Sequence, residues 1–443
     1  MSTGLLSQLD TYYSWIDEAQ NPIHPDEVAS LIDTPVRELA VPVPANPRPG
    51  WLTAVAAAAT VLVLVGGAAL LLRVTGSDSP VATTPPIDLP GIWSRIPHDE
   101  AVLGGPDGQV MVSVTVGGPG FVAVGGDGDD AAAWTSVDAV TWKRVPDEGN
   151  VFGGGDTGMS SVTVGGPGFV AVGGDGAGIA VWTSVDGVKW SRVVHDETVF
   201  GDASVFSVIE GGPGLVAVGS TEPGDNRSMP FNVDAVVWTS VDGLTWSRVP
   251  HDETVFGGEE NQYINDVTVG GPGLVAVGYD GCCTWANPLG VAAVWTSIDG
   301  VVWSRVPHDE SVFGPSNDAM VSVTAGGPGL VAVGYSFGCR PVWTSIDGIS
   351  WSRVPDDVPG ACNRVMRDVI ATESGLVAVG HGAASWTSVD GTNWIQIYEE
   401  VSGNDGQRML SVTATDSGLV TVGAVGLNIT GSNGDAAVWL WND

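Results

Sequence analysis

The sequence predicts an all-β protein: a seven-bladed β-propeller closed by one N-terminal and three C-terminal strands, and preceded by a single transmembrane helix. Three observations carry this prediction. First, seven segments repeat one hairpin pattern, in which Val- and Thr-rich stretches of period two flank a turn such as Gly117–Gly120. Second, a pair of tryptophans follows each of the first six hairpins. Third, the motif that contains these tryptophans is divided between the two ends of the repeat region.

The tryptophan pairs set the length of the repeat. Successive first tryptophans lie between 43 residues (Trp343 to Trp386) and 57 residues (Trp238 to Trp295) apart. A hairpin plus a second strand pair at this spacing is typical of a four-stranded propeller blade. The pairs are Trp134/Trp142, Trp182/Trp190, Trp238/Trp246, Trp295/Trp303, Trp343/Trp351 and Trp386/Trp394.

The divided motif predicts how the ring closes. The chain ends in VWLWND, so that Asp443 stands where the motif's aspartate belongs, and GIWSRIPHDE from Gly91 onward supplies the missing fourth strand. Pairing this N-terminal strand with the last blade would leave no exposed edge. We therefore expect the propeller to span residues 91–443.

The region before the propeller is expected to anchor it in a membrane. Residues 51–72 are 22 residues without a charge, long enough to cross a hydrocarbon core of about 30 Å. Residues 1–50 are expected to form a small cytoplasmic head, partly helical or disordered, and residues 73–90 a Ser/Thr/Pro-rich spacer. Two arginines precede the span and one follows it, which weakly favours an N-terminus inside the cell. The expected location is the cell membrane, with one span and an extracytoplasmic propeller.

The cysteines support this orientation, because all four follow the span, on the side where disulfides persist. In the propeller, Cys339 and Cys362 fall on one face and in one sector, which predicts a disulfide between them. Cys282 and Cys283 are then expected to pair with each other. A bond from one of these two to Cys339 or Cys362 is the main alternative.

The charge balance excludes one class of partner. The chain has 16 basic and 51 acidic residues and a net charge of −35, which repels nucleic acid and anionic lipid surfaces. No nucleic-acid partner is expected. A salt-rich habitat and cation binding would both explain the acidic excess.

The recurrent motif Ser-x-Asp-Gly-x-x-Trp, here called the box, is expected to be structural. Its aspartate can accept hydrogen bonds from its own turn, its glycine tolerates a left-handed conformation, and its tryptophan can cover the turn. The first copy has Ala139 in place of the glycine. The box aspartates are Asp138, Asp186, Asp242, Asp299, Asp347 and Asp390.

The box resembles the Asp-box, or bacterial neuraminidase repeat, of sialidase-like propellers, and the resemblance covers residues 91–443. The glycine follows the aspartate one residue sooner than in the usual sialidase form. The resemblance implies that each box lies between the third and fourth strands of a blade, on the face away from the active site. It predicts architecture more strongly than activity.

The face opposite the boxes is the expected binding surface. Long loops of irregular sequence, 220–234, 279–290 and 424–435, belong to this face. Aromatic and cationic residues that depart from the repeat cluster in one sector, which predicts a site for a protein, peptide or glycan; ordinary loop diversity is the alternative. The expected ligand-binding residues are Tyr279, Trp285, Tyr335, Arg340, Arg364, Arg367 and His381.

The segments between blades repeat His-Asp-Glu at His98, His195, His251 and His308. A repeated turn-capping device is the favoured interpretation, and a set of metal ligands is the alternative. No cofactor or metal is therefore expected. Calcium binding by Asp127, Asp129 and Asp130 is possible, although their spacing is not that of an EF-hand.

The leading functional hypothesis is a noncatalytic binding module. A sialidase-like glycoside hydrolase is the alternative, and would need Arg340, Arg367 and Arg408 to hold a substrate carboxylate and Tyr335 as nucleophile. Arg95 resembles part of the sialidase Phe-Arg-Ile-Pro motif, but related tetrapeptides recur in other repeats and make it framework. A third hypothesis is a sensor whose cytoplasmic head signals occupancy.

Overall fold

The computed structural model describes residues 92–442 with gaps, and the expected head, membrane span and spacer lie outside the described residues. Within the described part, no helix is long and apolar enough to cross a membrane. Of the four cysteines, Cys283, Cys339 and Cys362 are not described, nor is the Cys282 side chain, so both disulfides stay predictions. The gaps are 119, 156, 177, 195–196, 222–232, 259, 283–289, 315–316, 337–340, 356–364, 398–405, 416–417 and 427–433.

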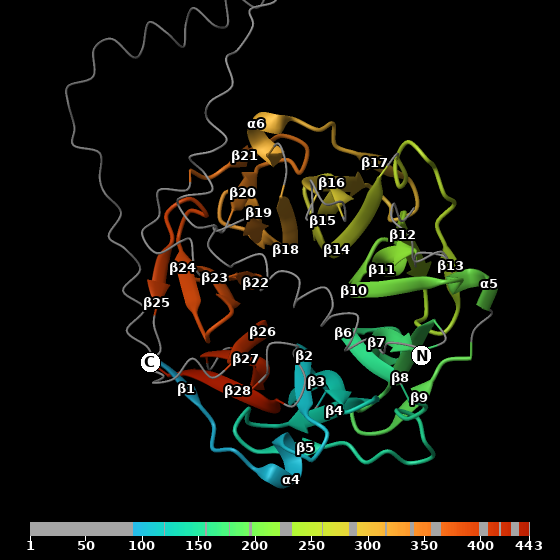
Figure 1. Ribbon diagram of the computed structural model, residues 1–443, viewed down its shortest axis with the longest axis vertical. Coiled ribbons are helices and arrows are strands. Elements are labelled where there is room, and N and C mark those ends of the chain that lie inside the picture. The colour runs from blue at the N-terminus through green and yellow to red at the C-terminus, as the bar shows by residue number, and fades with distance from the viewer. Residues whose placement is uncertain are drawn as a thin grey trace, which may run out of the picture. The chain divides into compact units, whose positions relative to one another are not determined.

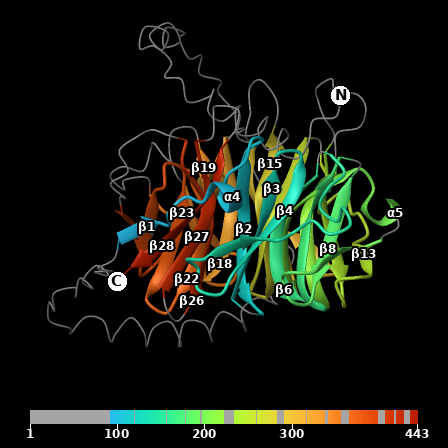
Figure 2. The ribbon, with the colours of Figure 1, turned by 90° about the horizontal axis from the view of Figure 1, so that it is seen from below.

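Seven four-stranded antiparallel sheets form the ring shown in Figures 1 and 2, which confirms the predicted seven-bladed propeller. The first strand of each blade lies nearest the ring axis and the fourth lies at the rim (Figure 1). Blade 1 comprises β2 (Gln109–Gly117), β3 (Gly120–Asp127), β4 (Asp130–Ser136) and β5 (Trp142–Arg144). Blade 2 comprises β6 (Thr157–Gly165), β7 (Gly168–Asp175), β8 (Ile179–Ser184) and β9 (Trp190–Arg192). Blade 3 comprises β10 (Ala203–Gly211), β11 (Gly214–Thr221), β12 (Ala235–Ser240) and β13 (Trp246–Arg248).

The remaining blades follow the same order. Blade 4 comprises β14 (Asn261–Gly270), β15 (Gly273–Cys282), β16 (Val291–Ser297) and β17 (Trp303–Arg305). Blade 5 comprises β18 (Asp318–Gly326), β19 (Gly329–Ser336), β20 (Val342–Ser345) and β21 (Trp351–Arg353). Blade 6 comprises β22 (Met366–Thr372), β23 (Gly375–Gly380), β24 (Ser385–Ser388) and β25 (Ile395–Ile397). Blade 7 comprises β26 (Arg408–Thr415), β27 (Gly418–Val425), β28 (Asp435–Asn442) and β1 (Ile92–Arg95), and three one-turn helices lie between blades: α4 (Glu100–Leu103), α5 (Glu197–Phe200) and α6 (Glu310–Phe313).

The predicted closure is confirmed, because β1 pairs with β28 as the fourth strand of blade 7. Trp93 lies opposite Trp441 in this pairing, and the two rings meet edge to face with their centroids 5.4 Å apart. The indole of Trp93 also donates a hydrogen bond of 2.8 Å to the hydroxyl of Ser385 in blade 6. The N-terminal strand therefore joins both ends of the repeat region.

The core lies between the blades. Seven clusters of buried apolar residues each join two neighbouring blades, including blades 7 and 1. The second strands are buried on both faces, which explains why segments such as Leu330-Val331-Ala332-Val333 are continuously apolar.

Hydrogen bonds also join the innermost strands of successive blades. Each inner strand has a β-bulge at one level, and the residue after it is serine or aspartate. Ser113, for example, accepts a hydrogen bond from the amide of Val162 in the next blade, and Ser411 accepts one from Val114 across the closure. Two blades carry Asp266 and Asp368 at this level instead. The ring is thus linked around its axis.

Candidate functional site

One face of the propeller, here called the lower face, carries the boxes, each on the turn between a third and a fourth strand. In blade 5, Asp347 Oδ1 accepts hydrogen bonds from the amides of Ile349 (2.9 Å) and Ser350 (2.6 Å). Trp351 closes the turn by donating from its indole to the carbonyl of Gly348, 2.9 Å away. The other five boxes make the same bonds.

These hydrogen bonds also lower the pKa of the box aspartates. The backbone amides hold the pKa of Asp138 and of Asp347 at about 2, because they stabilise the charged carboxylate. In the first box, Ala139 adopts the left-handed conformation with φ 62°, so this turn keeps its shape without the glycine. The box aspartates are therefore occupied by their own turns.

The lower face also presents apolar side chains. The residue before the box aspartate is largely exposed in the first five boxes, as at Val241 (73%) and Ile298 (82%). These residues recur from blade to blade with the turn that carries them. They do not distinguish one blade from another.

The opposite face, here called the upper face, differs from blade to blade. Tyr263 and Tyr279 come from paired positions of β14 and β15, and their rings stack with centroids 4.8 Å apart. Phe206 of blade 3 lies 6.5 Å from Tyr263 between ring centroids. Tyr279 and Tyr335 pack in a cluster that reaches blade 6. These residues, here called the aromatic arc, join blades 3 to 6.

The aromatic arc only partly matches the sequence-predicted site. Tyr279 and Tyr335 were expected to contact a ligand, but each is 2% exposed and packs against neighbouring blades. Phe206 and Tyr263 are half-buried, and sequence reasoning did not select them. The corresponding residues are Val110 and Val112 in blade 1 and Gly158 and Ser160 in blade 2, so the change to an aromatic side chain was the available signal.

Two arginines and a histidine meet beside the arc. Arg367 Nε donates a hydrogen bond of 2.9 Å to His381 Nε2, and His381 forms an isolated β-bridge with Arg408. Burial, followed by the positive charges of Arg367 and Arg408, lowers the pKa of His381 well below its usual value. The imidazole is therefore neutral and accepts the arginine's hydrogen bond. Trp285, Arg340 and Arg364, which were predicted to belong to this site, lie outside the described residues.

The aspartate of the His-Asp-Glu motif has different contacts from the histidine and the glutamate. Its central aspartate caps the turn that follows, since Asp252 accepts from the amide of Thr254 (2.9 Å) and Asp309 accepts from Ser311 (2.9 Å). This confirms the expected capping role for the aspartate. The histidine and the glutamate take no part in that cap.

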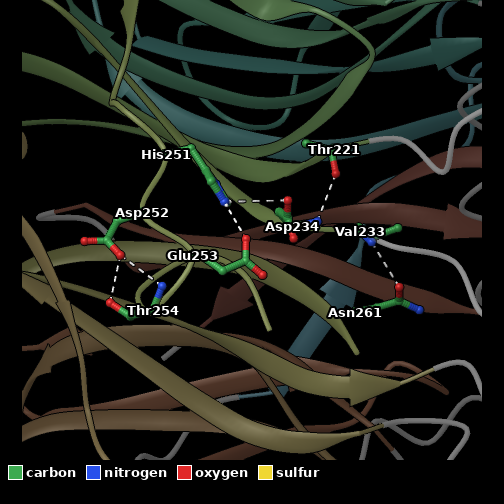
Figure 3. A network of polar contacts seen from close by, with 8 residues as sticks. All are labelled: Thr221, Val233, Asp234, His251, Asp252, Glu253, Thr254 and Asn261. Carbon is green, nitrogen blue, oxygen red and sulfur yellow. Dashed lines mark hydrogen bonds and ion pairs between the residues drawn. The ribbon is translucent and has the colours of Figure 1, made fainter. Parts of the chain in front are cut away.

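The histidine and glutamate instead meet a second aspartate. In blade 3, His251 Nε2 lies 3.1 Å from Glu253 Oε2 and 3.9 Å from Asp234 Oδ2 (Figure 3). Asp234 immediately precedes β12, and the other two residues follow β13. Burial raises the pKa of Asp234, which His251 partly offsets.

The same arrangement occurs in blade 7. There His98 Nε2 lies 3.0 Å from Glu100 Oε2 and 3.9 Å from Asp435 Oδ2. These two sets of residues, here called the His-Glu-Asp triads, are the groups in the described part of the chain that could hold a metal ion. The aspartates of the possible calcium loop are arranged differently, because Asp127 forms an ion pair with Arg144.

Comparisons with known proteins establish no family for this chain. No protein-family model matches it, and no curated protein matches it. Among solved structures, "YCF48 bound to D1 peptide" is 14% identical, with a TM-score of 0.48, and covers 83% of this chain and 100% of that chain. The WD40 β-propeller domain of Doa1 is 11% identical (TM-score 0.46; 80% of this chain, 96% of that one). Saccharomyces cerevisiae Sqt1 is 12% identical (TM-score 0.41; 76% and 96%), and likenesses this weak carry no inference about function.

Proposed function

We propose that this protein is a noncatalytic binding module that takes a protein or peptide partner on its upper face. The observation that carries the proposal is the difference between the two faces. The lower face repeats one turn around the ring, so a ligand of that turn would find several equivalent sites. Recognition of one partner in one orientation requires features that occur once, and the aromatic arc is such a feature.

The residues of the arc have suitable chemistry for such a partner. Aromatic side chains are enriched at the energetic centres of protein interfaces, because they bury a large area at low entropic cost. Phe206 and Tyr263 are half-buried, so they keep apolar surface that a partner can cover. The buried ring of Tyr279 stacks on Tyr263 and holds it in place.

The sialidase-like alternative is weaker on this structure. Its nucleophile would be Tyr335, whose side chain is 2% exposed within an apolar cluster. Its carboxylate-binding set would include Arg367, whose guanidinium donates to His381. Arg340, another arginine of that set, lies outside the described residues.

A binding experiment can locate the recognition surface. The purified full chain is applied to protein, peptide and glycan arrays, and each bound ligand is measured against two double variants. We expect a protein or peptide ligand whose affinity falls at least tenfold in Phe206→Ser/Tyr263→Ser, by about 1.4 kcal/mol or more. The matched control, Ile298→Ser/Ile346→Ser on the lower face, should bind as the wild type does.

Two results would overturn the proposal. One is a ligand that is lost with the lower-face variant and kept with the upper-face variant. The other is turnover of a fluorogenic sialoside that disappears in Arg367→Ala, because this would show catalysis at the upper face.

We further propose that residues 51–72 anchor the propeller outside the cell. The support is the uncharged sequence of this segment and the position of all four cysteines after it. Protease added to intact cells should then digest the propeller and spare residues 1–50. Release of the whole chain by salt or carbonate washing would contradict the anchor.

A further inference from the structure

Blades 3 and 7, which carry the His-Glu-Asp triads, share one arrangement: an aspartate at the start of the third strand without an aspartate at the facing second-strand position. In blades 1, 2 and 4, the aspartate at the upper end of the second strand, such as Asp280, forms an ion pair with the fourth-strand arginine, here Arg305. In blades 3 and 7 that second-strand position holds Thr221 or Val425. In these two blades the aspartate lies on the neighbouring third strand, directly opposite that second-strand position, as Asp234 or Asp435. This displacement brings a carboxylate to the histidine.

Blade 4 provides an internal comparison. It has the same His-Asp-Glu sequence, but Val291 occupies the position that corresponds to Asp234. Without that carboxylate, the imidazole of His308 lies against the ring of Phe313, with centroids 6.1 Å apart. The histidine therefore approaches its glutamate and the third-strand aspartate in the two blades where that aspartate lies opposite a residue without a carboxylate.

The spacing of the triad atoms suits a small cation. The three candidate ligand atoms of each triad lie within 4.8 Å of one another. Ligand atoms bound at about 2.1 Å in a tetrahedral zinc site lie roughly 3.4 Å apart. The distances from the histidine Nε2 to the two carboxylate oxygens, 3.0 to 3.9 Å, are close to this value.

A second observation in blade 3 concerns the other carboxylate oxygen of Asp234. Asp234 Oδ1 is buried and has no hydrogen-bond partner among the described residues. A buried carboxylate oxygen without a partner is costly, and a cation bound by the same carboxylate would compensate it. Its other oxygen, Oδ2, faces His251.

From this geometry we propose that each triad binds a divalent transition cation of the Zn²⁺ class. The ligands are the histidine Nε2, one glutamate oxygen and the third-strand aspartate, and water completes the coordination. Imidazole with carboxylates favours Zn²⁺ over Mg²⁺ and Ca²⁺, which prefer oxygen ligands alone. This site is independent of the partner surface on the aromatic arc.

The position of the triads gives the cation a structural effect. His98 and Glu100 directly follow the closing strand β1, and Asp435 begins β28, the strand with which β1 pairs. A cation in blade 7 therefore ties the N-terminal segment to the C-terminal strand. In blade 3 the cation ties the crossing toward blade 4 to β12.

Zinc binding to the full chain tests the proposal. The tag-free protein is stripped with a chelator and dialysed against Zn²⁺ in a large excess of Mg²⁺, which occupies sites made of carboxylates alone. Metal analysis should find one Zn²⁺ fewer per chain in His251→Ala and one fewer in His98→Ala. The matched control His308→Ala, in the blade without the third-strand aspartate, should bind as much Zn²⁺ as the wild type.

The thermal midpoint provides a second readout. Added Zn²⁺ should raise the midpoint of the wild type and a chelator should reverse the rise, because the cation binds only the folded state. Asp234→Asn, which keeps the size of the side chain, should lose part of this rise while its midpoint without metal changes little. Equal Zn²⁺ binding by the wild type and His98→Ala/His251→Ala would overturn the proposal, as would no Zn²⁺ binding in excess Mg²⁺.

Discussion

At the scale of single residues, the two tryptophans of a repeat have separate tasks. The second tryptophan closes its own box, as Trp351 does through the carbonyl of Gly348. The first tryptophan joins its blade to the preceding crossing segment, as Trp343 does by donating to the carbonyl of Val312, 2.8 Å away. Trp343 is completely buried, and its hydrogen bond reaches the partly exposed segment before blade 5. One tryptophan thus closes a turn and the other holds the preceding crossing segment against its blade.

Two aspartates on the inner strands form a second residue-scale feature. Asp266 accepts hydrogen bonds from the hydroxyl of Ser207 (2.8 Å) and from the amide of Val323 (2.9 Å), and so connects blades 3, 4 and 5. Burial, despite these bonds, raises its pKa to about 6, and the nearby charge of Asp368 adds to the rise. The folded state therefore holds a proton here that the unfolded state has already released.

This shift predicts a pH dependence of stability. The contribution of Asp266 is fully present below its ordinary pKa of 3.8 and is lost as pH rises through about 6, because the charged form is disfavoured in the fold. The loss amounts to at most about 3 kcal/mol. Asp266→Asn should remove this dependence, so that its unfolding free energy, relative to the wild type, improves between about pH 4 and pH 6.

Chemical denaturation across this range is the measurement, with Asp107→Asn, an exposed aspartate in the segment before β2, as the control. Parallel pH curves for the wild type and Asp266→Asn would contradict the prediction. The box aspartates act in the opposite direction and at lower pH, since their pKa values are lowered and their stabilisation is lost as pH falls toward about 2.

At the scale of elements, β1 is the strand on which the ring depends. It is only four residues long, yet it covers the edge of β28 and places Trp93 between blades 6 and 7. Without it, blade 7 would have three strands and an open edge. Deletion of residues 91–97 should therefore cause aggregation or a large loss of thermal stability, and unchanged melting would refute the closure.

A pair of point variants separates packing from pairing in this strand. Trp93 is 2% exposed and Ile92 is 69% exposed, although they are neighbours. Trp93→Ala should destabilise the protein by about 3–5 kcal/mol, because it empties part of an interblade core. Ile92→Ala should change stability by no more than about 0.5 kcal/mol.

At the scale of the whole molecule, stability comes from contacts between blades rather than within them. Each of the seven clusters takes its residues from two blades, and the closure supplies the seventh interface. A blade by itself would leave both faces exposed, which favours folding of the ring as a unit.

The net charge of −35 also affects the stability of the whole molecule. Like charges repel each other most in the compact state, and salt screens this repulsion over about 10 Å at 0.1 M. We therefore expect the thermal midpoint to rise with NaCl and to rise equally with KCl. The described arginine–aspartate pairs are partly buried, so salt screens them less than it screens the exposed charges. A midpoint that falls with salt would show that these pairs dominate.

The sequence by itself determined the number of blades, the order of the strands and the closure. These features depend on local patterns, namely period-two strands, turn glycines and a motif divided between Gly91 and Asp443. It also predicted the local hydrogen bonds of the boxes, because these lie within a few residues of Asp347 and its equivalents.

Only the tertiary structure decided which distant residues meet. His98 and Asp435 come from opposite ends of the propeller and lie together because β1 pairs with β28. Tyr335 departs from the repeat as a binding residue would, but neighbouring blades cover it. Burial and ligand geometry depend on the register and packing of strands far apart in the chain, which no local pattern specifies.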